Sequence, residues 1–81
     1  MFYTAEEIST NIEDDLLYIN DPECRSMFNN VIENTNKEET LKTLRLIQRR
    51  LIDIKHIHQL NINLTNTIKK IDDYIFEKDL E

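Results

Sequence analysis

Any chemistry in this chain depends on one cysteine, two histidines and several pairs of acids. Cys24 is the only thiol, and it follows Pro22 so closely that it falls in the first turn of a predicted helix. The helix dipole lowers a thiol pKa there, but Cys24 also shares the apolar face of Met27 and Phe28. We therefore expect a buried core cysteine and no nucleophile.

The spacing of the histidines and of the acids does not predict an active site. His56 and His58 stand two residues apart, so on a helix they point about 200° apart and cannot share a metal ion. Adjacent acids diverge by about 100°, and several pairs fall in first turns, where the helix dipole favours them. The chain has no glycine, which excludes the usual phosphate-binding loops. We expect no enzyme, no metal and no cofactor.

A basic stripe is the most informative surface feature of the predicted third helix. Four side chains fall within an arc of about 60°, opposite an apolar face: Lys42, Arg45, Arg49 and His56. Three interpretations of the stripe are open: a solvated face, a face paired with acids of the first helix, and a docking face for an acidic protein or a nucleic acid. Asp53 interrupts it and the net charge is −6, so a protein partner is favoured over a nucleic acid.

Charge is also segregated along the chain. Residues 1–40 hold ten acids and two bases, and residues 41–60 hold five bases and one acid. Charged faces mainly set encounter rate and specificity, so exposed apolar residues such as Tyr18 or Phe76 are candidates for binding energy. The candidate partner-binding residues are Lys42, Arg45 and Arg49, or the acidic patch of Glu13, Asp14 and Asp15.

The first helix is predicted over residues 5–19. Ile8, Ile12 and Leu16 recur at helical spacing. Thr4 and Glu7 have the spacing of a capping box at the start of this helix.

The second helix is predicted over residues 22–33 and has the clearest beginning. Asn20 suits the left-handed residue that ends a helix, Asp21 is a good N-cap, and Pro22 suits the first helical position. The apolar face of this helix comprises Cys24, Met27, Phe28, Val31 and Ile32.

The third helix is predicted over residues 37–59. A capping box formed by Thr35 with Glu38, or by Asn36 with Glu39, begins it. Its apolar pattern runs through Leu41, Leu44, Ile47, Leu51 and Ile54 to Ile57, with Leu46 and Ile52 off that face.

Residues 60–64 alternate between apolar residues and asparagine, which blurs the prediction there. We favour a turn, with Asn63 or Thr65 as the cap of a last helix over residues 64–78. A single continuous helix over residues 37–79 is the alternative.

These elements predict one all-α domain over residues 1–81, an antiparallel bundle of three to four helices. The first residues lack the pattern of a signal peptide, and no apolar run is long enough to span a membrane, so we expect a cytoplasmic protein. The expected core comprises Ile8, Ile12, Leu16, Phe28, Val31, Leu44, Ile47, Leu51, Ile54, Leu64, Ile68, Ile71 and Ile75.

The functional hypothesis is a non-enzymatic protein-binding module that acts by occlusion or scaffolding, as inhibitors, immunity proteins, antitoxins and adaptors do. The absence of a catalytic constellation, the small size and the segregated charge favour it. One alternative is a small nucleic-acid-associated regulator that uses the basic stripe. Another is a self-assembling structural or chaperone subunit, in which residues 41–75 form the seam of a homodimer.

Overall fold

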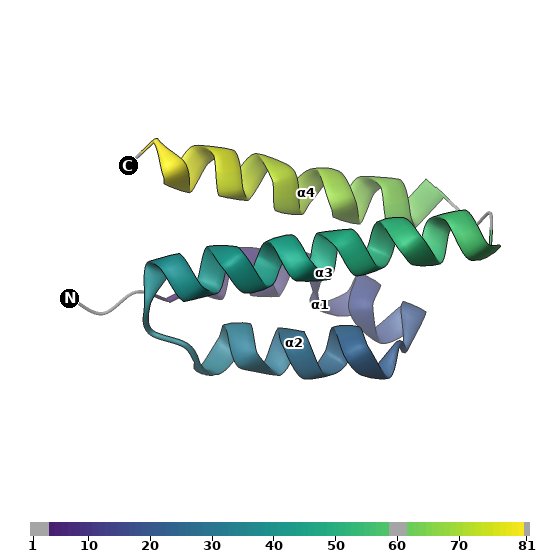
Figure 1. Ribbon diagram of the computed structural model, residues 1–81, viewed down its shortest axis with the longest axis horizontal. Coiled ribbons are helices and arrows are strands. Elements are labelled where there is room, and N and C mark those ends of the chain that lie inside the picture. Colours follow the sequence, from purple (N-terminus) through teal and green to yellow (C-terminus); the bar gives the residue numbers. More distant parts are fainter. Residues whose placement is uncertain (1–3, 59–61, 81) are drawn as a thin grey trace.

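Four helices make up the computed structural model, which describes residues 4–58 and 62–80 but not the side chains of residues 58, 62 and 63. They are α1 (Glu6–Ile19), α2 (Pro22–Glu33), α3 (Lys37–His58) and α4 (Ile62–Asp79) (Figure 1). This part of the chain contains no strand. The predicted all-α fold is confirmed.

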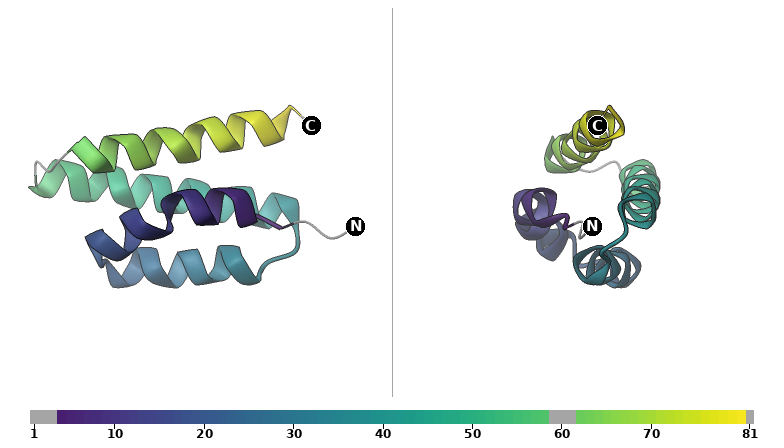
Figure 2. Two further views of the ribbon diagram at one scale, coloured as in Figure 1. Left: turned by 180° about the vertical axis from the view of Figure 1, so that it is seen from behind. Right: turned by 90° about the vertical axis from the view of Figure 1, so that its left-hand side faces the viewer.

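The helices are arranged as a ring. α1 contacts α2 and α4, and α3 also contacts α2 and α4, so α1 and α3 lie diagonally opposite each other (Figure 2). The bundle measures 40 × 24 × 17 Å. α3 and α4 lie side by side and antiparallel (Figure 1), so the alternative of one continuous helix is wrong.

The core lies on the axis of this ring, where the apolar stripes of the four helices meet. Every expected core residue is buried except Ile68, which is partly buried and packs against the others. Cys24 is also buried, as predicted, and Ala5, Leu41 and Tyr74 complete the apolar core.

Two residues predicted on buried faces are exposed. Ile32 is 57% exposed. Around the axis of α2 it lies about 40° from Phe28, on the side away from Val31, and therefore outside the buried face. Ile57 is exposed because each step of three residues turns a helix by only about 300°, so the position after Ile54 drifts off the core face. Leu46 and Ile52 are exposed, as their position off that face predicted.

The junction between α1 and α2 matches the prediction. Asn20 takes the left-handed conformation with φ 54°, and its N–H donates to the Leu16 carbonyl at 3.0 Å. Asp21 caps α2, accepting from the Cys24 N–H at 3.0 Å, and Pro22 follows at the first helical position. At the start of α3, the Asn36 side chain accepts from the Glu39 N–H at 3.1 Å, which is one half of a predicted capping box. The Asn36 N–H donates to Asn34 Oδ1 at 2.8 Å, so the return bond to Glu39 is replaced.

Two other helix starts differ from the prediction. The capping box at Thr4 is wrong: Ala5 is the N-cap of α1 and has no side-chain cap bond, because burial of its methyl group in the core sets where the helix begins. α4 begins at Ile62, so Asn63 and Thr65 lie inside the helix and not at its cap. Packing of Leu64 in the core outweighs the weak helix propensity of this stretch. The predicted end of the third helix, residue 59, lies outside the described residues.

Candidate functional site

Cys24 lies in an environment that keeps its thiol protonated and unreactive. It is fully buried in the first turn of α2. Burial raises the pKa of the Cys24 thiol to about 12, and the neighbouring Asp21 carboxylate adds to the shift. The thiolate is the nucleophilic form, so near neutral pH the side chain acts as a small apolar core residue.

The described histidine and acidic side chains do not form a metal-binding cluster. His56 is exposed on α3, and the side chain of His58 is outside the described part of the structure. Among the residues described, no three His, Cys, Asp or Glu side chains lie close enough together to hold a metal ion. Within the same ranges, no helix is both long and apolar enough to cross a bilayer.

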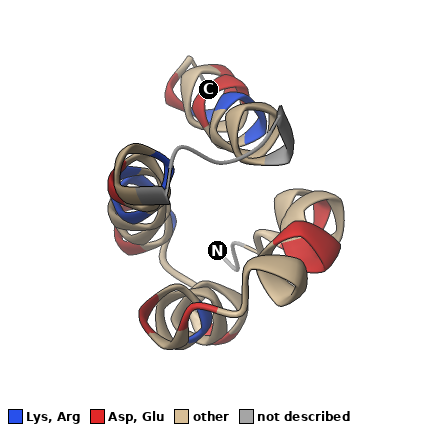
Figure 3. Ribbon diagram, turned by 90° about the vertical axis from the view of Figure 1, so that its right-hand side faces the viewer, with Lys and Arg blue, Asp and Glu red and all other residues tan. Residues whose placement is uncertain are grey.

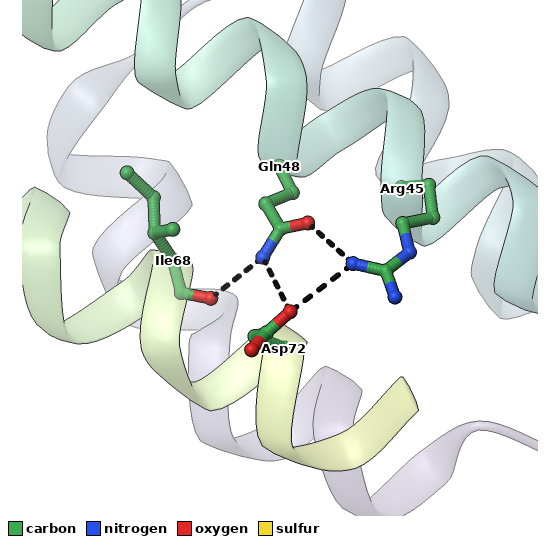
Figure 4. Close-up of polar contacts among 4 residues, drawn as sticks. All are labelled: Arg45, Gln48, Ile68 and Asp72. Atoms are coloured by element: carbon green, nitrogen blue, oxygen red, sulfur yellow. Dashed lines mark hydrogen bonds and ion pairs between the residues drawn. The ribbon is translucent and has the colours of Figure 1, made fainter. Parts of the chain in front are cut away.

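Arg45 of the predicted basic stripe closes the seam between α3 and α4. Its Nη1 donates to the Asp72 carboxylate at 3.1 Å and to Gln48 Oε1 at 3.0 Å (Figure 4). Gln48 is buried, and its Nε2 donates to the Ile68 carbonyl at 3.2 Å. Arg45 therefore holds two helices of the same chain together.

Lys42 and Arg49, the other two candidates in the stripe, are exposed on the outer side of α3 and form no ion pair with any residue that the structure describes. Arg49 lines a shallow hollow of about 340 Å³ with the apolar side chains of Leu46 and Ile52. Of the three candidate cations in the stripe, Lys42 and Arg49 are thus the two without an ion pair in the described part of the chain.

The predicted acidic patch also divides. Asp15 faces α4, where its carboxylate accepts from Thr67 Oγ1 at 2.8 Å and from Lys70 Nζ at 3.4 Å. Glu13 and Asp14 are exposed, and neither forms an ion pair within the described ranges. Asp15 supports the bundle, and Glu13 and Asp14 remain available on its surface.

Internal ion pairs of α3 go to its neighbours in the ring and not to α1. The Arg50 guanidinium binds both carboxylate oxygens of Asp21 at 3.1 Å and lies 3.2 Å from Glu23. This hydrogen bonding lowers the pKa of Asp21, against a smaller opposing effect of burial. Pairing of the basic stripe with the first helix, one of the predicted alternatives, does not occur among the described residues, because α1 is diagonally opposite.

A groove that the sequence did not predict lies between α1 and α2. Two adjoining hollows of about 350 and 140 Å³ lie along it and share Glu13, Phe28 and Ile32. Phe28 is 8% exposed and lies at the base, while Leu17 (54%) and Ile32 (57%) are the exposed apolar side chains. We call this feature the α1/α2 groove. Its residues are Thr4, Ala5, Glu6, Ser9, Thr10, Glu13, Leu16, Leu17, Arg25, Phe28, Asn29 and Ile32.

A sequence signal for the groove is that Leu17 lies outside the Ile8–Ile12–Leu16 stripe. Ile32, the other exposed apolar residue of the groove, was predicted on the buried face of the second helix. Tyr18 and Phe76 are exposed as predicted, but neither lines this groove.

Comparison with protein-family models, with curated proteins and with solved structures found no match for this chain.

Proposed function

We propose that this protein is a non-enzymatic protein-binding module and that its binding surface is the α1/α2 groove. The observation that carries the proposal is the position of two large apolar side chains, Leu17 and Ile32, each more than half exposed beside a hollow whose base is Phe28. Exposed apolar side chains that border a hollow are typical of protein interaction sites.

The chemistry of the titratable groups supports a role without catalysis. A thiol with a pKa of about 12 supplies no nucleophile at neutral pH. Asp15 and Arg45, both candidates for partner binding, form hydrogen bonds or ion pairs with residues of α4. A bundle only 17 Å across in its shortest dimension binds most readily through its outer faces, and it acts by covering a partner or by bridging two partners.

The α1/α2 groove is favoured over the outer face of α3. The hollow on α3 is bordered by Arg45, which is held by Asp72, and it has no buried aromatic base. Within the stripe, the nucleic-acid alternative depends mainly on Lys42 and Arg49, because Asp72 offsets part of the charge of Arg45.

Site-specific photo-crosslinking tests the proposal in the cell that makes the protein. Benzoylphenylalanine is placed at Ile32 or Leu17 in the groove, or at Phe76 and Tyr18, which are somewhat more exposed, as controls. We expect one discrete covalent adduct from the groove positions and none from the controls. The crosslinked protein is then purified, and its affinity should fall at least about tenfold with Leu17→Asp or Ile32→Asp, as for an interface hot spot. Adducts from Phe76 alone, or none at all, would reject the groove as the binding surface.

A further inference from the structure

The α1/α2 groove is acidic along its α1 side. Glu6 and Glu13 line it, and Glu7 and Asp14 are exposed on the same helix. α1 contains no lysine or arginine, so it shows red but no blue in Figure 3. Arg25 is the one cation among the lining residues, and it lies in the first turn of α2, at the end of the groove next to the α1–α2 junction.

The groove has the length of a short helix. Its α1 wall extends from Ala5 to Leu17, which is about 18 Å at 1.5 Å per residue. A partner helix of about three turns spans this length and presents apolar side chains at i, i+4 and i+7 on one face. Those side chains would pack beside Leu17 and Ile32, above Phe28.

Resting on the function proposed above, we propose that the occupant of the α1/α2 groove is a cationic amphipathic helix of another protein. Its apolar face fills the groove, and lysines or arginines on its flank pair with Glu6 and Glu13. Neither acid forms an ion pair within the described part of the chain, so both are available for this pairing. Opposite charges across the interface raise the encounter rate and reject acidic partners.

Other occupants fit the groove less well. A nucleic acid would bring phosphates against the acidic α1. A second copy of this chain could offer the outer face of α3, but Asp53 lies beside the bases there and Arg45 is already held by Asp72.

Three synthetic helical peptides with identical apolar positions test the proposal. Their remaining positions carry lysine, glutamine or glutamate. Binding is measured by calorimetry and mapped by amide chemical shifts. We expect the lysine peptide to shift groove amides, to bind at least about tenfold more tightly than the glutamine peptide, and to lose this advantage at about 0.5 M salt.

Charge variants then assign the effect to the groove. Glu6→Gln and Glu13→Gln should each weaken the lysine peptide several-fold, whereas Glu77→Gln, which changes an exposed acid on α4, should not. Glu13→Lys should weaken the lysine peptide further and improve the binding of the glutamate peptide. This reciprocal change separates charge pairing from loss of fold.

Each contrary outcome is distinct. Equal or tighter groove binding of the glutamine or glutamate peptide would overturn the cationic occupant and leave the proposed function standing. The cationic occupant would also be overturned if the lysine peptide shifted amides of α3 or α4 instead of groove amides, or if no peptide bound. A third contrary outcome is a concentration-dependent dimer in sedimentation that Glu13→Lys dissociates, because a second copy of the chain would then be the occupant. Failure of the proposed function is read separately, from the absence of crosslinks at Leu17 and Ile32.

Discussion

At the residue scale, Asp21 combines two tasks at the start of α2. One carboxylate oxygen accepts from the Cys24 N–H at 3.0 Å, which caps the helix, and both oxygens accept from Arg50 of α3. A single side chain therefore begins one helix and joins it to the next element in the ring. The predicted N-cap is confirmed, but the link to Arg50, 29 residues later in the chain, depends on the packing of α2 against α3.

Two substitutions at Asp21 separate these tasks. Asn caps a helix about as well as Asp, so Asp21→Asn keeps the cap and removes the charge together with one of the two oxygens that accept from Arg50. Asp21→Ala also removes the cap and should cost about 1 kcal/mol more. Because the pKa of Asp21 is lowered from its ordinary 3.8, the folded state binds fewer protons than the unfolded state near that pH. The contribution of the charge is therefore present above pH 3.8 and is lost as pH falls through the lowered pKa.

Urea unfolding between pH 2.5 and 7 measures this effect. The stability difference between the wild type and Asp21→Asn should be constant from pH 5 to 7 and should shrink below pH 4. A difference that is the same at every pH would show that the ion pair with Arg50 contributes nothing to stability.

The buried thiol makes a second prediction at this scale. With a pKa of about 12 and no exposed surface, Cys24 should react with a thiol reagent at pH 8 only when the protein opens. We expect labelling at least about a hundredfold slower than in 8 M urea, with a rate that follows global unfolding. Rapid labelling of the folded protein would contradict its place in the core.

At the element scale, the sequence predicted best where a backbone rule and the apolar pattern agreed. Asn20, Asp21 and Pro22 combine an end, a cap and a first-turn residue, so the boundary between α1 and α2 was predicted correctly. At Thr4 a local capping pattern competed with burial of Ala5, and burial decided. Near residue 62 a weak local propensity competed with the packing of Leu64. A local sequence pattern does not show how much packing against a neighbouring helix stabilises a given helix start.

The left-handed residue between α1 and α2 can be tested directly. Asn20 has φ 54°, a conformation that glycine tolerates and β-branched residues strongly disfavour. We expect Asn20→Gly to change the free energy of unfolding by less than about 0.5 kcal/mol and Asn20→Val to cost roughly 1–2 kcal/mol. Thermal unfolding of both variants measures these changes in the free energy of unfolding. Equal stabilities of the two variants would contradict the left-handed conformation of Asn20.

The seam between α3 and α4 distinguishes an exposed ion pair from a buried amide. Arg45 and Asp72 are both more than half exposed, so Arg45→Ala should cost less than about 1 kcal/mol. Gln48 is buried and donates to the Ile68 carbonyl, so Gln48→Ala should cost more, about 1–3 kcal/mol. Denaturant midpoints compare the two. Arg45→Ala should also leave groove binding unchanged, since Arg45 lies on a different face.

At the scale of the whole molecule, the ring of helices determines which charges remain available. The sequence shows that acids gather in α1 and bases in α3, but not that Arg45, Arg50 and Lys70 pair across adjacent helices. Those pairs depend on antiparallel register, which brings residue 45 beside residue 72. The groove depends on the side of α1 that faces α2. Both features arise from tertiary packing, so periodicity along one helix did not predict them.

The same packing argues against the predicted homodimer seam over residues 41–75. Most of the described apolar stripe of that region is already buried within one chain, with Leu44, Leu51 and Ile71 all fully covered. A dimer through this seam would have to open the bundle and expose α1. We therefore expect sedimentation equilibrium to give one monomer mass, near 9.8 kDa, from about 10 μM to 500 μM at moderate salt. A mass that rises toward a dimer, together with slower thiol labelling of Cys24 at high concentration, would support an opened and re-paired bundle instead.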